Sequence, residues 1–323
     1  MQQHRRPFIG RLARAAALSG LAALTLVVAL PLVARARATA DAPPMTLEWV
    51  LTPDGLRWYR QALPPGYDPE AGPYPVVFLF HGGGGNALQA AGAYGVIDEA
   101  LARGYVAIAP EGSGALGGPP LFSLETWNAG NCCSYAQEQG IDDVAFFEAM
   151  VVKLVGSAAV DPERVYVTGM SNGAMMSYRL AAERPDLVTA AAPVAGVLGI
   201  DTPPVGPVPL FAIHGLLDEN VPFWGGVGIG VSQTDYASQL DSLLPFVAVN
   251  GGALPAGPIE LDQALVFVAP GPARGADTIY YLALDGGHSW PGTAPGPASP
   301  LASVHATPAT PLIFDFFDLH RGQ

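Results

Sequence analysis

The chain has 323 residues, of which 50% are hydrophobic and only 13% are charged, and its formal net charge is −13. Residues 1–40 hold six arginines and no acid, so the remainder of the chain carries −19. A chain this acidic argues against nucleic acid and anionic membrane surfaces as partners. The roughly 283 residues after position 40 are enough to form one large domain, because α/β sheets commonly reach this size around one core.

Residues 1–40 have the organisation of an export signal. Arg5 and Arg6 precede an apolar stretch over 15–33, and Ala38-Thr39-Ala40 offers a small-x-small cleavage site before Asp41. The segment that begins at Arg5 resembles a twin-arginine signature; the alternative is an ordinary charged leader. The apolar stretch is long enough for a membrane anchor, but its many alanines make it weakly hydrophobic. We predict a cleaved signal peptide, a secreted or periplasmic protein, and no stable membrane association after cleavage.

Apolar runs alternate with helical segments after residue 41. The runs that predict buried strands are 74–80, 105–109, 165–168, 209–214 and 278–284. The segments that predict helices are 144–155, 174–182 and 236–244. Pro/Gly-rich stretches that predict loops are 112–120, 222–230, 245–258 and 291–300. This alternation predicts a single α/β domain with a mostly parallel central sheet flanked by helices.

The most informative motif is Gly169-Met170-Ser171-Asn172-Gly173, because a β-branched run ends there and a helix-compatible run begins. This strand–serine–helix pattern is typical of the turn that carries the nucleophile in serine esterases. There the serine lies on a very tight turn, and glycines are needed where strand and helix nearly touch. Gly-x-Ser-x-Gly alone is common, but between a strand and a helix it is specific. We predict that Ser171 is a catalytic nucleophile and not a structural serine.

A serine hydroxyl needs a base to accept its proton and an acid to orient that base. His288 lies in a glycine-containing loop after the last predicted strand, where an α/β-hydrolase places its base. His305, in a later loop, is the alternative base. Asp218 follows a predicted strand and lies between Ser171 and His288 in the chain, which gives the expected order of nucleophile, acid and base. Glu219 is the alternative acid.

Catalysis also needs hydrogen-bond donors for the oxyanion that develops on the substrate. The predicted strand at 74–80 runs into His81 and four glycines, where backbone N–H groups can face a carbonyl with no Cβ in the way. A phosphate-binding loop is the alternative, but no Gly-Lys-Ser/Thr follows. We predict that the N–H groups of Gly83 and Asn172 form the oxyanion hole, with Gly82 or Gly84 as substitutes for Gly83.

The chain contains a set of short motifs whose sequence and order along the chain can be compared with known families. They are Phe80-His81-Gly82-Gly83-Gly84-Gly85-Asn86, Trp127-Asn128-Ala129-Gly130-Asn131-Cys132-Cys133, Ile141-Asp142-Asp143-Val144, the Gly-x-Ser-x-Gly motif, 214–222 and Gly287-His288-Ser289-Trp290-Pro291. This set resembles the extracellular polyhydroxybutyrate depolymerase and feruloyl/acetyl-xylan esterase group, carbohydrate esterase family one in the broad sense. The resemblance implies an α/β-hydrolase fold, the triad named above and an ester substrate bound above the strand ends. One departure is Ala174, where many members of the group carry glycine.

Cys132 and Cys133 are the only cysteines and are adjacent. Because an exported protein seldom keeps free thiols, the pair predicts a vicinal disulfide; an intermolecular bridge and two reduced thiols are the alternatives. Two cysteines are too few to hold zinc, and we expect no metal and no cofactor. We predict that Trp127, Cys132, Cys133 and Trp290 line the substrate cleft. The alternative for both tryptophans is packing under loops.

The features together predict a secreted serine esterase that hydrolyses polyester oligomers of the polyhydroxybutyrate kind or short acyl esters. Feruloyl or acetyl-xylan esterase activity on plant polysaccharide is the alternative. A prolyl-oligopeptidase-like peptidase shares the order of the triad, but its extra propeller or lid domain has no room in this chain. A catalytically dead binding protein is disfavoured by the intact triad. We expect a monomer with an open apolar cleft.

Overall fold

The computed structural model describes residues 44–115, 124–230, 232–272, 275–294 and 303–321. The predicted signal peptide at 1–40 lies outside the described residues. No helix within these ranges is both long enough and apolar enough to cross a membrane. The chain from Asp41 onward forms one compact unit.

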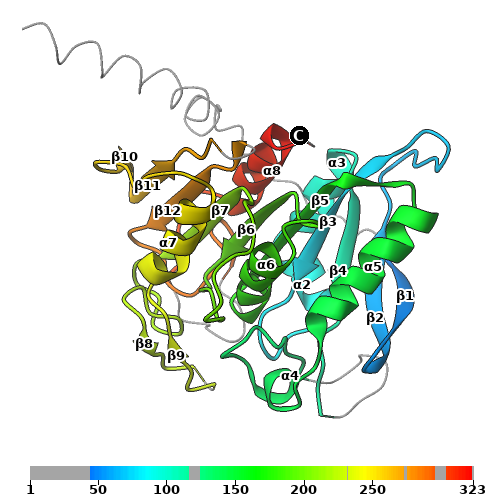
Figure 1. Cartoon of the computed structure of the whole chain (residues 1–323), viewed down its shortest axis with the longest axis horizontal. Coiled ribbons are helices and arrows are strands. Elements are labelled where there is room, and N and C mark those ends of the chain that lie inside the picture. The colour runs from blue at the N-terminus through cyan, green and yellow to red at the C-terminus, as the bar shows by residue number, and fades with distance from the viewer. Residues whose placement is uncertain (1–43, 116–123, 231, 273–274, 295–302, 322–323) are drawn as a thin grey trace, which may run out of the picture. The chain divides into compact units, whose positions relative to one another are not determined.

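A ten-stranded sheet runs through the described part of the chain, in the order β1-β2-β4-β3-β5-β6-β7-β12-β11-β10 (Figure 1). Its strands are β1 (Thr46–Thr52), β2 (Gly55–Ala62), β3 (Tyr74–Phe80), β4 (Val106–Pro110), β5 (Val160–Met170), β6 (Ala190–Val194), β7 (Leu210–Gly215), β10 (Ile259–Leu261), β11 (Ala264–Ala269) and β12 (Thr278–Ala283). Pairing is parallel from β4 through β12 and antiparallel at both edges. A separate two-stranded ribbon joins β8 (Gly226–Val227) to β9 (Asp235–Tyr236).

Helices cover both faces of this sheet. On one face lie α5 (Asp143–Ser157), α6 (Asn172–Glu183) and α7 (Gln239–Val249); on the other lie α2 (Ala87–Ala93), α3 (Val96–Ala102) and α8 (Ala309–Leu319), while α4 (Ser134–Glu138) precedes α5. Side chains of β3 alternate between the two cores, because successive residues of a strand face opposite sides of a sheet. Phe78 and Phe80 lie in the first core, and Val77 and Leu79 in the second. This confirms the predicted α/β fold, with a mostly parallel centre buried on both faces.

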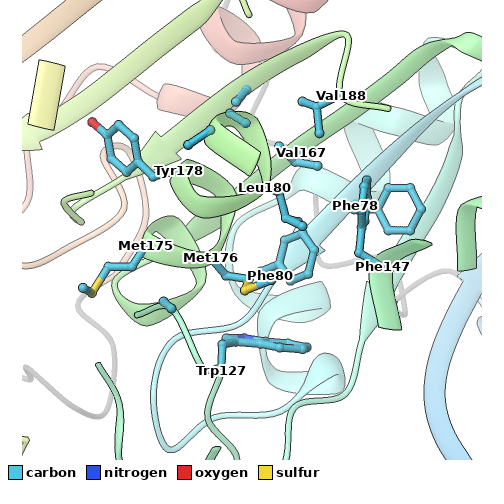
Figure 2. Packing of buried hydrophobic residues seen from close by; sticks show 14 of the residues in the cluster. Phe78, Phe80, Trp127, Phe147, Val167, Met175, Met176, Tyr178, Leu180 and Val188 are labelled. Carbon is cyan, nitrogen blue, oxygen red and sulfur yellow. The ribbon is translucent and has the colours of Figure 1, made fainter. Parts of the chain in front are cut away.

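The core next to α6 is aromatic. Figure 2 shows Phe78 beside Phe147 of α5 and Phe80 above Trp127. The ring centroids are 4.9 Å apart in the first pair and 5.1 Å apart in the second, both with edge-on geometry. Each of these side chains is essentially inaccessible, which stabilises the fold by roughly 1.5–3 kcal/mol per side chain. The packing holds β3 against α5 and Trp127, and β3 leads into the glycine-rich segment described below.

Every predicted strand and helix is present, but the predicted loop at 245–258 is wrong at its start. Pro245 was expected to open a loop at 245–258, whereas it lies inside α7. A proline removes one N–H donor from a helix and usually disrupts it. Here α7 is held at its start by Ser238, whose side chain accepts the N–H of Asp241, and by the buried Phe246 beyond the proline. The loop therefore starts only after Asn250. Strand β8 lies within the predicted loop at 222–230, and parts of the predicted loops at 112–120 and 291–300 lie outside the described residues.

The sheet brings two of the predicted motifs together. β3 pairs in parallel with β5, and Phe80 lies opposite Gly169 at the end of the pairing. The glycine-rich segment after β3 and Ser171 after β5 therefore emerge side by side. From β3 the chain continues to β4 on one side of it, and from the neighbouring β5 it continues to β6 on the opposite side. The loops after β3 and β5 therefore lie at a topological switch point, where α/β proteins commonly bind ligands.

Candidate active site

Ser171 lies on the tight turn between β5 and α6. Its φ is 58° and its ψ is −123°, a conformation that residues other than glycine seldom adopt. The flanking glycines make the turn possible. A Cβ on Gly169 would lie 2.6 Å from the Phe80 carbonyl oxygen, and a Cβ on Gly173 would collide with the same carbonyl. The motif therefore folds locally as expected, with strand and helix too close together for any side chain at either glycine.

His288 connects Ser171 to Asp218. Its Nε2 lies 2.9 Å from Ser171 Oγ, and its Nδ1 lies 2.8 Å from Asp218 Oδ2. Ser171 is half-buried, whereas His288 and Asp218 are 6% and 4% exposed. The three side chains come from the loops that follow β5, β12 and β7, at the carboxyl ends of parallel strands. A hydroxyl that can donate to an imidazole, which in turn can donate to a carboxylate, is an arrangement that can activate a serine for attack on a carbonyl.

The surroundings of Asp218 keep its carboxylate ionised. Its Oδ1 accepts the backbone N–H groups of Asn220 and Val221, at 2.9 and 2.8 Å. Burial raises the pKa of Asp218, but the interactions with His288, a second buried histidine and the Val221 N–H outweigh burial, so its pKa lies below the usual value. Glu219, the alternative acid, is exposed to solvent. The geometry thus favours Asp218 as the group that orients His288.

His305, the alternative base, is engaged elsewhere. Its Nδ1 lies 2.6 Å from Asp285 Oδ1, and its Nε2 lies 2.8 Å from the Tyr281 hydroxyl. Both ring nitrogens therefore have partners outside the cluster around Ser171. Of the two candidate bases, the structure brings only His288 to the serine.

His81 is buried beneath the glycine-rich loop. Its Nε2 accepts the N–H of Gly112 at 3.0 Å, so its Nδ1 carries the proton and donates to the Gly82 carbonyl at 2.9 Å. Burial lowers the pKa of His81 to about 4. The neutral imidazole thus holds the start of this loop against the segment after β4.

The two predicted oxyanion donors are neighbours. A Cβ on Gly83 would lie 3.5 Å from Asn172 Cβ. The N–H of Asn172 belongs to the first turn of α6, where N–H groups have no partner within the helix and the helix dipole is positive. Gly84, one of the two substitutes for Gly83, donates its N–H to the Glu125 carbonyl at 2.8 Å, so that group is committed. Gly82 stays an alternative.

A contact of Asn172 that the sequence does not indicate connects this region to Trp127. Asn172 Oδ1 accepts the Trp127 backbone N–H at 2.7 Å, and Nδ2 donates to the Trp127 carbonyl at 3.0 Å. The indole Nε1 donates to the His81 carbonyl at 2.9 Å. Trp127 is therefore clamped between the turn at Ser171 and the glycine-rich loop. Its side chain is 0% exposed, so its prediction as a cleft residue is wrong and the packing alternative holds.

Trp290 is likewise a packing residue and not a cleft residue. It is 1% exposed, stacks on Tyr94 with ring centroids 4.6 Å apart, and donates from Nε1 to the Thr310 hydroxyl. Cys132 and Cys133 form the predicted vicinal disulfide, joined by a cis peptide. At 0% and 7% exposure they too lie beneath the surface, so they offer no open cleft wall. Cys132 Sγ instead lies 3.9 Å from Asn172 Nδ2.

The apolar side chains that are exposed on the loops around the proposed catalytic residues are not the ones predicted from the sequence. Leu217, next to Asp218, is 55% exposed, and Trp224, further along the same loop, is 81% exposed. Leu124 is 78% exposed, and its side chain would lie 3.8 Å from a Cβ on Gly84. Pattern analysis misses them because exposure depends on how the loops fold. Within the described ranges, no three histidine, cysteine or acidic side chains are placed to hold a metal ion.

Comparison with known proteins identifies the family. A model described as the dienelactone hydrolase family matches residues 66–225. A protein of Nocardia uniformis subsp. tsuyamanensis, named as an esterase (NocK), is 30% identical over 279 residues, which cover 79% of this chain and 76% of that protein. This chain belongs to the dienelactone hydrolase family of esterases.

Other members of this esterase family agree with the resemblance derived from the sequence. Feruloyl esterase C of Emericella nidulans is 32% identical over 180 residues, which cover 53% of this chain and 58% of that protein. Further relatives are named acetylxylan esterase and poly(3-hydroxyalkanoate) depolymerase. The solved acetyl xylan esterase of Aspergillus awamori matches the fold with a TM-score of 0.54 at 17% identity, covering 78% of this chain and 96% of that one. The α/β-hydrolase fold is thereby confirmed.

Proposed function

We propose that this esterase is a serine carboxylic ester hydrolase in which Ser171 is the nucleophile, His288 the base and Asp218 the acid. The observation that carries the proposal is His288, which lies within hydrogen-bond distance of both Ser171 Oγ and Asp218 Oδ2. A buried ionised carboxylate orients the imidazole, and a strained turn presents the half-buried hydroxyl to a bound ester. No other described histidine contacts Ser171.

The reaction proceeds through an acyl-enzyme. Ser171 Oγ attacks the ester carbonyl while its proton passes to His288 Nε2, and the oxyanion accepts hydrogen bonds from the N–H groups of Gly83 and Asn172. His288 then protonates the departing alkoxide, which leaves Ser171 acylated. Water, deprotonated by His288, attacks the acyl group, and the acid departs as Ser171 recovers its proton. Asp218 remains ionised throughout. Apart from this water, the protein's own residues supply every group that the reaction uses.

We propose short acyl esters and hydroxybutyrate-type oligoesters as substrates. The exposed apolar residues Leu124, Leu217 and Trp224, on loops next to the proposed catalytic residues, favour an uncharged, apolar substrate. Apolar side chains that are open to solvent suit soluble oligomers and accessible chain segments. Hydrolysis of long-chain triglycerides should be much slower.

Feruloyl or acetyl esters on plant polysaccharide are the second candidate. One observation favours them: the matched relatives named feruloyl and acetylxylan esterase cover up to 54% and 42% of this chain, whereas the named depolymerase covers 18%. A hydrolysis panel separates the candidates. Purified protein and its Ser171→Ala variant are assayed on p-nitrophenyl butyrate, hydroxybutyrate oligomers, methyl ferulate and acetylated xylan. Loss of turnover in the variant assigns the activity to Ser171, and the relative kcat/KM values rank the substrates.

We also propose that the enzyme is exported as a monomer after removal of residues 1–40. The arginine-rich start, the apolar stretch and the small residues before Asp41 support cleavage. The acidic mature chain supports an enzyme that binds neither nucleic acid nor anionic membranes.

A further inference from the structure

Asp218 faces two histidines. Its Oδ2 lies 2.8 Å from His288 Nδ1 and 3.5 Å from His214 Nε2. His214 is the fifth residue of β7, and its side chain, like that of Asp218, is 0% exposed. The proposed reaction uses His288 only, so His214 is a buried polar side chain beside the acid with no role assigned so far.

The neighbours of His214 decide where its proton lies. Its Nε2 is 3.0 Å from the Val221 carbonyl oxygen, and on the same side is the carboxylate of Asp218. Gln239 Nε2 is 3.4 Å away but donates at shorter range to the Gly196 carbonyl, at 3.1 Å. Because two acceptors face His214 Nε2, this nitrogen carries the proton and donates to Val221. Burial, opposed by Asp218, lowers the pKa of His214 and keeps the ring neutral.

The loop that carries Asp218 is held at Val221, where both the backbone N–H and the carbonyl have side-chain partners. The Val221 N–H donates to Asp218 Oδ1 at 2.8 Å, and the Val221 carbonyl accepts from His214. The N–H of Gln239, at the start of α7, adds a third bond to this loop by donating to the Phe223 carbonyl. His214 therefore joins the rigid strand β7 to the backbone that orients the acid.

We propose that His214 is a positioning residue of the esterase reaction: by holding Val221 and facing Asp218 Oδ2, it fixes the carboxylate in the place from which it orients His288. This inference rests on the proposed function. The His214 side chain is 0% exposed and makes no hydrogen bond to Ser171, so its loss should lower kcat and leave KM nearly unchanged.

Two variants separate positioning from packing. His214→Leu fills the space but has no donor, and kcat on p-nitrophenyl butyrate should fall by about 10- to 100-fold with KM within about 2-fold. In His214→Gln the side-chain amide can still donate to Val221, and most of the lost kcat should return. The matched control is His320→Leu, another buried histidine, whose Nδ1 lies 2.8 Å from the Phe316 carbonyl oxygen and which makes no hydrogen bond to the proposed catalytic residues; it should leave kcat unchanged.

A double-mutant cycle with Asp218→Asn provides the decisive measurement. If His214 acts through Asp218, His214→Leu should have little further effect on kcat once Asp218 is already replaced. Equal fractional losses in both backgrounds would overturn the proposal, and so would a His214→Gln variant as slow as His214→Leu with an unchanged melting temperature. If His214→Leu does not fold, His214→Asn takes its place in both backgrounds, because its shorter amide matches the position of Nδ1 and leaves Val221 without the donor at Nε2. Wild-type turnover that survives Ser171→Ala would instead reject the proposed function itself.

Discussion

The side chain of Asn172 satisfies both backbone polar groups of Trp127, although 45 residues separate them in the chain. The same residue offers its own backbone N–H at the start of α6, next to Gly83. One asparagine thus joins the packing of Trp127 to the proposed oxyanion hole. Its side chain stabilises the fold, and we propose that its main chain serves the reaction.

Replacing Asn172 by alanine should therefore affect both stability and turnover. A buried Trp127 N–H left without a partner costs about 1–3 kcal/mol, and the turn at Ser171 loses its attachment. We expect kcat on p-nitrophenyl butyrate to fall by roughly 10-fold, since one oxyanion donor loses its support. Urea unfolding and steady-state kinetics measure the two effects. Asn131→Ala, which removes an exposed bond to the Asp235 carbonyl, is the matched control. A variant with wild-type stability would show that the clamp is not needed.

Acid should destabilise the enzyme partly through His81. Its pKa in the folded protein, about 4, lies below the usual 6.5, so between these values the unfolded chain binds more protons than the folded one. The free energy of unfolding therefore falls as the pH falls from 6.5 to 4, by about 3 kcal/mol from this residue. His214 and His320 act in the same direction. His81→Gln should show a shallower loss of stability across this range in urea titrations. Parallel curves for variant and wild type would exclude His81 as a source.

The vicinal disulfide should influence turnover more than stability. A bridge between adjacent residues closes almost no loop, so it restricts the unfolded chain very little. Cys132 Sγ, however, contacts the Asn172 side chain. We expect the double variant Cys132→Ser/Cys133→Ser to unfold within about 1 kcal/mol of wild type but to have altered kcat or KM. The intact mass of the wild-type protein should lie about two daltons below that of its reduced form, without a covalent dimer. Two thiols that alkylate freely in the native protein would contradict this.

Cleavage of the N-terminal segment is tested directly on exported protein. N-terminal sequencing should find a start near Asp41. If export follows the twin-arginine route, replacing Arg5 and Arg6 by lysines should retain the precursor inside the cell. Recovery of Met1 at the start of the exported protein would rule out a cleaved signal.

The sequence predicts the central elements and the candidate triad because their determinants are local. The continuous apolar run at β3 and the glycine-flanked Ser171 need no distant information. The antiparallel strands β1 and β2 lack such runs: β1 is mostly exposed, and β2 contains Arg57 and Arg60. At the other edge β11 (Ala264–Ala269) is a continuous apolar run, so it was recognisable from the sequence although it is not among the predicted strands. β6 was missed because it is built from alanines and a proline, without the β-branched residues that mark a strand.

The residues around the site were harder to predict than the triad itself. Trp127 and Trp290 are aromatic residues in glycine-rich loops, a pattern equally compatible with a cleft wall and with packing. Their burial is decided by partners such as Asn172 and Tyr94, which lie far away in the chain. The exposure of Trp224 depends in the same way on the path of its loop.

The central claim is that Ser171 is the nucleophile, and turnover of the Ser171→Ala variant tests it most directly. The substitution removes only Oγ and keeps the Cβ already accommodated at this turn, so the protein should fold with an unchanged melting temperature. We predict that kcat on p-nitrophenyl butyrate falls by roughly 10³-fold or more, because nucleophile, base and acid act as a unit. His288→Ala should match this loss. A folded Ser171→Ala protein with wild-type turnover would contradict the account.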